Sequence, residues 1–460
     1  MKASILFLIA LTLSGCSIFR SNIGTKLDTG LSIALIADTQ VTSPYKGKNK
    51  FRTIEADFIV NVAIRTTAQE ELSLKHLRLL LEDIGEQNVD IITYLGDGAN
   101  SGCKDEVSGF FKVLEESRAR LQKPLFFVIG NHDYLATGNQ PSIEALKDTC
   151  SEKNGFVSKL DLIRIVQKFN LDSFNQHKGD YLLSFKDNVE DLSNECLLSI
   201  VENQQKSGCF YGAIITYLKN GISGELILAD SSDYKDIDVQ PALLRNDFYG
   251  HRGSISWKGE SQTSWFISNF GNPTVRIIAT HYPIENLAYV SAGPIGRQGD
   301  LLLKGRHSNL WLTGHSHEKN ADDVIFTHKI GSGDEKRFTT QINVGSTTDF
   351  TPHFSIATPV EKRVIKKSFT SIEKIGSKSC ELMLDSLVAY DLLQVLDVQH
   401  SQQDRLGLTG LYRNKNYNTE NARRNINTVL DSVSEDDKGK LIRCMMYEAS
   451  KNESELKSVL

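Results

Sequence analysis

The amino-acid sequence predicts an α/β fold, in which helices pack on the faces of β-sheets. Short apolar runs that indicate buried strands alternate with segments of helical periodicity over the first third of the chain, and more strand-like runs follow later. The two helices are expected at residues 67–84 and 107–121. The strands are expected at residues 31–37, 90–95, 125–129, 211–218, 225–229, 274–280, 309–313, 323–327 and 338–344.

Several of these apolar runs end in a polar loop that carries carboxylate, amide or imidazole groups. Side chains at the ends of neighbouring strands converge at one edge of a sheet, so we expect these groups to lie together. Carboxylates, amides and imidazoles are also ligands of divalent metals. The residues are Asp38, Asp97, Asn131, His132, His281, His315 and His317.

Length and composition leave most classes of soluble protein open. The 460 residues allow two ordinary domains or one large α/β domain with insertions. Hydrophobic residues make up 40% and charged residues 24% of the chain, as in ordinary globular proteins. A net charge of −5 gives no reason to expect nucleic-acid binding through bulk electrostatics.

The pattern of the chain divides it into four parts. The α/β pattern loosens between 134 and 224, which predicts either an insertion that shapes a substrate pocket or a long excursion between sheet strands. Beyond residue 370 leucine and valine recur at helical spacing, which predicts a helical C-terminal extension. The four parts are a signal peptide at 1–15, a tether at 16–30, the α/β domain at 31–370 and the extension at 371–460.

The N-terminus has the composition of an export signal. Lys2 precedes an apolar run, Ile5 to Leu13, that is too short to span a bilayer. The sequence Leu13-Ser14-Gly15-Cys16 that follows resembles the lipobox of bacterial lipoproteins. The resemblance implies cleavage before Cys16, lipid attachment to its thiol, and a place in the bacterial cell envelope, facing the periplasm or at the outer membrane. The alternative is an uncleaved buried helix with an incidental cysteine.

Six cysteines remain after Cys16, and an even number in an exported chain favours disulfides. The sequence leaves every pairing open, and pairing between neighbours is the simplest of them. Buried unpaired thiols are the alternative. The neighbour pairs are Cys103 with Cys150, Cys196 with Cys209, and Cys380 with Cys444.

The residues at the strand ends suit two divalent ions that share one bridging ligand with negative charge. Asp97 is the expected bridge, because the other groups divide into two sets around it. His315 and His317 lie two residues apart on a turn and can point in different directions. One ion would be held by Asp38, Asp97 and His317, and the other by Asp97, Asn131, His281 and His315.

The order of these blocks resembles the signature of the calcineurin-like metallophosphoesterases, and four of the five blocks match cleanly. The resemblance covers roughly residues 31 to 346. It implies a sandwich of two mixed β-sheets flanked by helices, and two divalent ions such as Mn, Fe or Zn. It also implies hydrolysis of a phosphate mono- or diester, in which a metal-bridging hydroxide attacks phosphorus in line. His132 would lie beside the ions and act as the catalytic residue, by stabilising developing charge or protonating the leaving oxygen.

Two positions depart from the family pattern. Gln40 stands where the family usually has a histidine, and an amide oxygen is a poorer ligand than imidazole for zinc or iron. We therefore expect Gln40 to be a weak ligand of the first ion. Asn100 stands where some relatives have an aspartate that pairs with the catalytic histidine, and we expect its side chain to orient His132. These departures favour an alternative function, a non-catalytic lipid-anchored binding protein with a degenerate metal site.

Two further polar groups have alternative explanations. Asp133 either orients a metal ligand through a hydrogen bond or caps the segment that follows it. The sequence Asp230-Ser231-Ser232-Asp233 follows a predicted strand, and either lines the cleft or forms a turn.

Overall fold

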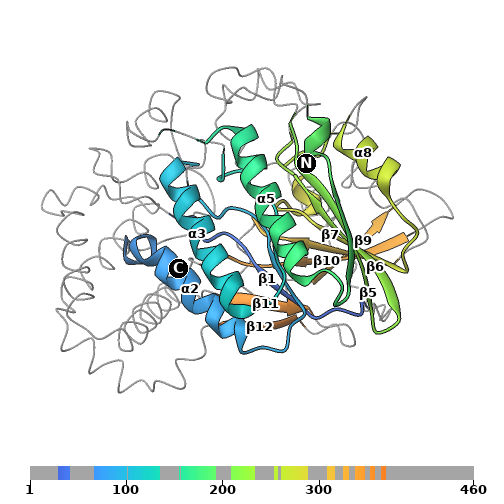
Figure 1. Ribbon diagram of the computed structural model, residues 1–460, viewed down its shortest axis with the longest axis horizontal. Helices are drawn as coiled ribbons and strands as arrows, with labels where there is room; N and C mark the ends of the chain where they lie inside the picture. Colours follow the sequence, from blue (N-terminus) through green and yellow to red (C-terminus); the bar gives the residue numbers. More distant parts are fainter. Residues whose placement is uncertain are drawn as a thin grey trace, which may run out of the picture.

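The computed structural model is a sandwich of two mixed β-sheets with helices on both sides (Figure 1). The sandwich of two mixed β-sheets flanked by helices, which was expected from the sequence, is therefore confirmed. Cys16, His317 and the predicted C-terminal helices lie outside the described residues. The structure describes residues 29–41, 67–100, 102–134, 155, 157–192, 209–233, 253–256, 261–287, 308–315, 325–330, 337–347, 353–357 and 364–368.

The first sheet has five strands. Its central strand and the two strands that follow it toward one edge run parallel to one another. All four residues of its first strand are buried, as the apolar run predicted. On its other side this strand pairs antiparallel with β11 (His353–Ala357), a strand that the sequence pattern did not predict. The order is β12 (Val364–Ser368), β11 (His353–Ala357), β1 (Ile33–Ile36), β2 (Ile91–Tyr94) and β3 (Leu125–Phe127).

The second sheet has seven strands and is also mixed. Side chains alternate between its two faces: Ile277 belongs to the main core between the layers, whereas Ile278 belongs to a smaller core on the other face. The order is β4 (Leu182–Asp187), β5 (Gly212–Lys219), β6 (Ile222–Ala229), β7 (Val275–Ala279), β8 (Ser308–Thr313), β10 (Arg337–Asn343) and β9 (Ile325–Ile330).

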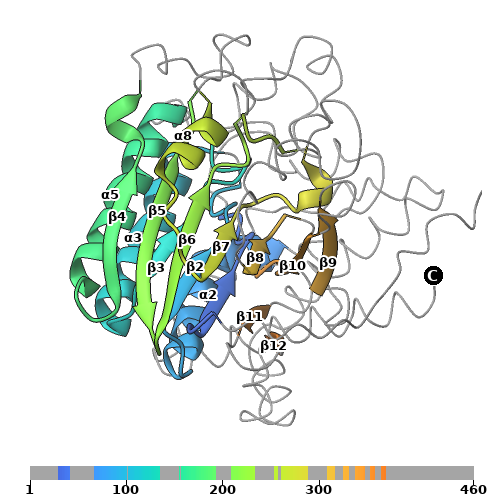
Figure 2. The ribbon, with the colours of Figure 1, turned by 90° about the vertical axis from the view of Figure 1, so that its right-hand side faces the viewer.

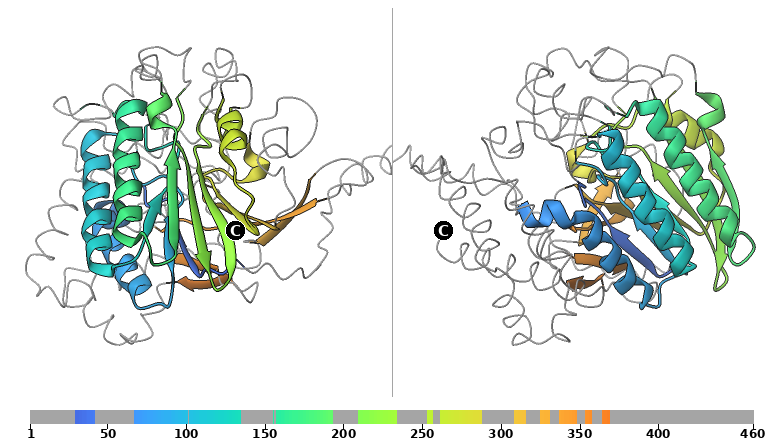
Figure 3. Two further views of the ribbon diagram at one scale, coloured as in Figure 1. Left: turned by 45° about the vertical axis from the view of Figure 1, so that its right-hand side comes forward. Right: turned by 60° about the vertical axis from the view of Figure 1, so that its left-hand side comes forward.

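Helices cover the sandwich from both sides (Figures 2 and 3). Three long helices lie side by side on one side of the strands, and a short helix lies on the other. The short helix buries Phe266 in the smaller core against β5 to β8. Within the part of the chain described, no helix combines the length and apolar character needed to cross a membrane. The long helices are α2 (Thr67–Gly85), α3 (Lys104–Leu121) and α5 (Lys159–His177), and the short one is α8 (Gln262–Asn269).

The segment 134–224 contributes regular elements to the sandwich. Helix α5 and strands β4 and β5 all come from it. The sequence pattern predicted β5 but neither α5 nor β4. Helix α5 packs against β3 and β4, which belong to different sheets, so it joins the two layers along one edge.

Asn170 of α5 forms hydrogen bonds with the backbone of β3, the edge strand of the five-stranded sheet. Its side chain accepts a hydrogen bond from Phe127 N at 2.8 Å and donates one to Phe127 O at 3.0 Å. Ser173 Oγ accepts a further bond from Leu125 N at 2.8 Å. The helix therefore supplies the hydrogen bonds that another strand would supply, and closes the edge.

Replacing Asn170 should destabilise the protein by leaving two buried backbone groups unpaired. We expect Asn170→Leu to lower the free energy of unfolding by about 2–4 kcal/mol, measured by urea denaturation. Lys168→Ala, an exposed position of the same helix, should change it by less than about 0.5 kcal/mol. Equal effects of the two variants would contradict this role of Asn170.

Candidate metal centre

Five strands bring the predicted site residues to one region. Asp38 follows β1, Asp97 follows β2, and Asn131 and His132 follow β3, all at the carboxyl ends of parallel strands. His281 and His315 follow β7 and β8, which are parallel neighbours in the second sheet. The hydrogen bonds described below connect the residues of both sheets, so the convergence expected from the strand ends is found in the structure.

Unusual backbone conformations are concentrated at these strand ends. Among the described residues, six other than glycine have positive φ, and four of them are predicted metal ligands. Each such residue costs about 1–3 kcal/mol, and such strain is typical of functional sites. The four are Asp38 (φ 57°), Gln40 (φ 45°), Asp97 (φ 57°) and His315 (φ 70°).

Two glycines of the sequence motifs allow the loops to approach each other. A Cβ atom on Gly130 would lie 2.2 Å from Asp97 Oδ1, and one on Gly96 would lie 2.8 Å from His281 Nδ1. Gly96 also has φ of 88°, which a side chain would disfavour. Both positions therefore require glycine to let Asp97, Asn131 and His281 meet.

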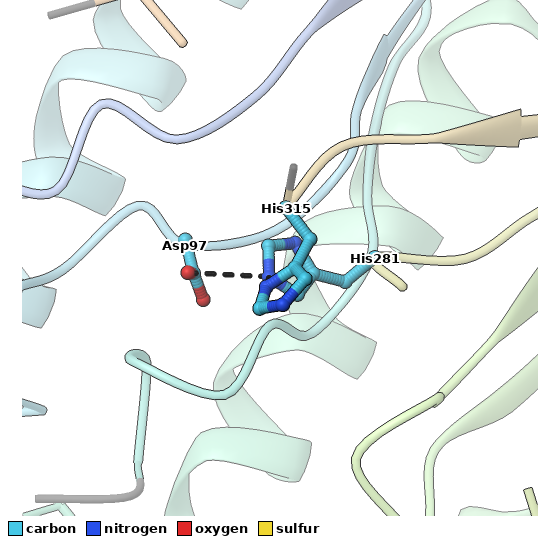
Figure 4. Close-up of side chains that lie close together, drawn as sticks. All are labelled: Asp97, His281 and His315. Atoms are coloured by element: carbon cyan, nitrogen blue, oxygen red, sulfur yellow. Dashed lines mark hydrogen bonds and ion pairs between the residues drawn. The ribbon is translucent and has the colours of Figure 1, made fainter. Parts of the chain in front are cut away.

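Four possible ligand atoms lie close together. His281 Nε2 lies 3.2 Å from Asp97 Oδ2, 3.1 Å from Asn131 Oδ1 and 3.2 Å from His315 Nδ1. Figure 4 shows Asp97, His281 and His315 converging from three loops. Atoms that bind one ion at about 2.1 Å lie roughly 3.0–3.4 Å apart, and the three distances from His281 Nε2 fall in this range.

The tautomer of His281 also suits a metal. Its Nδ1 lies 2.8 Å from the carbonyl oxygen of Leu95, to which it donates. Because Nδ1 carries the proton in the neutral ring, Nε2 is left with a lone pair that faces Asp97 and Asn131. The side chain is fully buried, so water cannot replace these neighbours of the ring.

Asp97 lies between the two predicted ligand sets. Its Oδ2 faces His281 and also accepts a hydrogen bond from Gln40 Nε2 at 3.2 Å. Its Oδ1 accepts the backbone N–H of His132 at 2.9 Å, which holds the carboxylate plane. This position agrees with a bridging role. Gln40 is brought to the site, and in this structure its amide nitrogen faces Asp97.

Asp38 contacts the site through the backbone of the loop that follows β8. Its Oδ2 accepts the N–H of His315 at 3.0 Å. The hydroxyl of buried Tyr94 donates to Thr39 Oγ1 at 2.5 Å and accepts from Thr39 N at 2.9 Å, which fixes the loop after Asp38. Burial raises the pKa of Tyr94 well above its usual value, so this hydroxyl keeps its proton.

Asp133 holds the backbone of the metal ligands. Its carboxylate accepts from the backbone N–H groups of Asp97 at 3.1 Å, Ala99 at 3.0 Å and Gly130 at 2.8 Å. Of the two alternatives drawn from the sequence, these bonds favour the role of orienting a ligand.

His132 is oriented by the backbone of Asn100. The Nδ1 atom of His132 lies 2.6 Å from the Asn100 carbonyl oxygen, and Nε2 lies 3.9 Å from Asp97 Oδ2. From the sequence we expected the Asn100 side chain to orient this ring, whereas this bond is to the backbone oxygen of Asn100. Every residue type has a backbone carbonyl oxygen, so this hydrogen bond does not require asparagine at this position.

The pKa values follow from burial and from the charges around Asp97. Burial opposes ionisation of Asp97, but the imidazoles of His281 and His132 outweigh it and lower the pKa. Burial also lowers the pKa of His281, yet the Asp97 carboxylate raises it to about 9. Burial, followed by repulsion from Asp97, raises the pKa of Asp133 to about 7.

Comparison with known proteins identifies the family. A sequence profile of the calcineurin-like phosphoesterases matches residues 31–319, which is more than half of the chain. The chain belongs to the calcineurin-like phosphoesterase family. A search of curated proteins found no match.

Several solved structures are similar to this phosphoesterase at low sequence identity. A dimetal phosphatase from Danio rerio is 16% identical, with a TM-score of 0.36 over 74% of this chain and 96% of that one. A purple acid phosphatase from yellow lupin is 12% identical, with a TM-score of 0.30 over 73% of this chain and 52% of that one. A 5′-nucleotidase from Candida albicans is 12% identical, with a TM-score of 0.28 over 93% and 58%.

Metal affinity of this phosphoesterase should rise with pH. In the metal-free protein His281 holds a proton at neutral pH, because its pKa is about 9, and a binding ion must displace that proton. We expect the association constant for Mn²⁺ to rise by up to about tenfold per pH unit from roughly pH 7 to 8.5, because one proton is displaced. Calorimetric titration in buffers of different ionisation enthalpy measures both the affinity and the protons released.

His281→Gln provides the control for this prediction. Glutamine carries no titrating proton, so the variant should bind Mn²⁺ more weakly and release about one proton fewer per ion than the parent protein. A pH-independent affinity in the parent, or the same proton release in both proteins, would contradict the proton assignment.

Proposed function

We propose that this phosphoesterase hydrolyses a phosphate mono- or diester at a dinuclear metal site. The observation that carries the proposal is the convergence of Asp97, Asn131, His281 and His315 on one point in a member of this family. When His281 is protonated, its Nε2–H can donate to only one of its three neighbours, Asp97, Asn131 and His315, at a time. A divalent ion would satisfy all four groups together.

The ligands divide into two sets that share Asp97. The first set is the one just described. The second consists of Asp38, Gln40, Asp97 and His317, of which His317 lies outside the described residues. When bound, divalent ions such as Mn, Fe or Zn lower the pKa of water and polarise phosphoryl oxygens.

His132 is the catalytic residue in this proposal. Its Nδ1 is held by the Asn100 carbonyl oxygen, so Nε2 is the atom directed toward Asp97 and the metal ligands. When the ring is protonated, Nε2 donates a proton to the leaving alcohol oxygen as its bond to phosphorus breaks. The backbone N–H of the same residue binds Asp97 Oδ1, so the acid and the bridging ligand are held by one residue.

Asp97→Asn should abolish turnover, because the amide removes the negative charge from the bridging position. We expect kcat on phenyl phosphate or bis-phenyl phosphate to fall by about 10³-fold or more. The protein should also bind less metal, as measured by elemental analysis after dialysis. Full activity in the variant, or in parent protein after exhaustive chelation, would refute metal-dependent hydrolysis.

The same metal analysis separates this proposal from the non-catalytic alternative. The hydrogen bond from Gln40 to Asp97 favours weak binding of the ion on the side of Asp38 and Gln40, which is consistent with that alternative. A dinuclear enzyme should approach two equivalents of metal at saturation. Less than one equivalent, together with no turnover, would support a degenerate site.

His132→Gln should lower kcat while leaving metal content unchanged, because His132 donates a proton and binds no ion in this scheme. We expect a loss of about 10²- to 10⁴-fold for an alkyl leaving group, and a smaller loss for an acidic aryl leaving group that needs no proton. Steady-state rates on a series of leaving groups measure this difference. Loss of metal, or equal losses across the series, would contradict the assignment.

A further inference from the structure

A buried ion pair lies beside the site and takes no part in the proposed chemistry. Lys159 Nζ lies 2.6 Å from Asp230 Oδ2, and their side chains are 6% and 0% exposed. Lys159 is the first residue of α5, where a positive charge opposes the helix dipole. Both burial and this location are unfavourable for a lysine, so helix formation alone does not explain it.

Tyr134 links this ion pair to the loop of the catalytic residue. Lys159 Nζ lies 3.8 Å from the centre of the Tyr134 ring, a cation–π contact. The Tyr134 hydroxyl donates to the carbonyl oxygen of Ser232 at 2.5 Å. Since Tyr134 is two residues beyond His132, these contacts fix the end of the His132 loop against the loop that follows β6. We refer to Lys159, Asp230 and Tyr134 as the Lys159 cluster.

The backbone of the His132 loop is also packed. A Cβ atom on Gly102 would lie 2.9 Å from Tyr134 Cα, so the two backbones are in close contact. Val157 N donates to Gly102 O at 2.9 Å, which ties the start of α5 to the same segment. The His132 loop is therefore held by a backbone contact with Gly102 as well as by the Lys159 cluster.

The loop after β6 also holds a metal-ligand loop. Ser231 Oγ accepts hydrogen bonds from His281 N at 3.1 Å and Tyr282 N at 3.0 Å. The flanking residue Asp230 donates its N–H to Gln262 Oε1 at 2.8 Å, and its carbonyl oxygen accepts from Gln262 Nε2 at 2.8 Å. One rigid loop thus contacts both the His132 loop and the His281 loop.

We propose that Lys159, Asp230 and Tyr134 are positioning residues, which set the location of His132 relative to the metal ligand His281. The connection runs from His132 through Tyr134 and Lys159 to Asp230, and from the adjacent Ser231 to His281. The expected kinetic effect rests on the proposed function of His132. The expected effect on the mobility of the loop depends only on the packing.

The chain offers a matched control at the other end of the second sheet. Arg276 and Glu225 form a buried ion pair at 3.0 Å, with side chains 2% and 3% exposed. The guanidinium carbon of Arg276 also lies 3.8 Å from the centre of the Phe270 ring, a cation–π contact like that of Lys159 with Tyr134. Arg276 lies five residues before His281, about 16 Å along β7 from the site. Breaking this pair imposes a similar structural loss without touching the His132 loop.

The kinetic test compares Lys159→Met with Arg276→Met, both as metal-loaded proteins. Lys159→Met should lower kcat about 10- to 100-fold with little change in KM or metal content, whereas Arg276→Met should change kcat less than about threefold. Lys159→Arg, which keeps the charge, should restore most of the activity. Tyr134→Phe keeps the ring but loses the bond to Ser232, and should show a smaller loss than Lys159→Met.

A double-variant cycle separates positioning from general destabilisation. Because Lys159 acts through His132, adding Lys159→Met to His132→Gln should cause no further loss of kcat. Full multiplication of the two losses would overturn the proposal. A kcat in Lys159→Met that equals that of Arg276→Met would overturn it as well.

Amide hydrogen exchange tests the packing without any activity. Lys159→Met and Tyr134→Phe should raise exchange in peptides covering 130–134 and 230–233, and Arg276→Met should not. If the parent protein hydrolyses no phosphate ester, the proposed function fails while this exchange result still decides the positioning role. Unchanged exchange in these peptides in both variants of the Lys159 cluster would refute it.

Discussion

The carboxylate of Asp97 is the group on which the arrangement of the site depends. It is buried, it faces the imidazole of His281, and it also accepts hydrogen bonds from His132 and Gln40. A buried charge is stable only when opposite charge and hydrogen-bond donors surround it closely. The loops after β2, β3 and β7 are therefore held in place by the need to satisfy one carboxylate, as well as by their own turns.

This constraint explains why strain is concentrated at the strand ends. Asp97 has a left-handed backbone conformation, and its N–H is directed to Asp133. Such a conformation persists only where the surrounding structure determines it, and here the two packed sheets do so. The site is therefore formed by the whole sandwich, because Asp97 comes from one sheet and His281 from the other.

The sequence predicted the parts of this structure in which local pattern and final environment agree. Buried parallel strands that end in polar residues identified Asp38, Asp97, Asn131 and His281 as neighbours. Helix α5 was missed because its buried face carries Asn170 and Ser173, which bind the edge of β3 and interrupt the apolar periodicity. Strand β4 was missed because it is an edge strand with several exposed side chains. The contacts of Lys159 were beyond prediction, since they join residues far apart in the sequence through tertiary packing alone.

The geometry of Gln40 refines the meaning of the departure from the family pattern. Its amide nitrogen donates to Asp97 Oδ2, the oxygen that also faces His281. For Gln40 to act as a ligand in the proposed site, its amide would have to turn and present its oxygen, and it would then lose this hydrogen bond to Asp97. Imidazole in the same position would offer a lone pair without losing a bond to Asp97. In the proposed dinuclear site, glutamine would therefore compete for Asp97 Oδ2 in addition to being a weaker ligand, and that oxygen also belongs to the ligand set around His281.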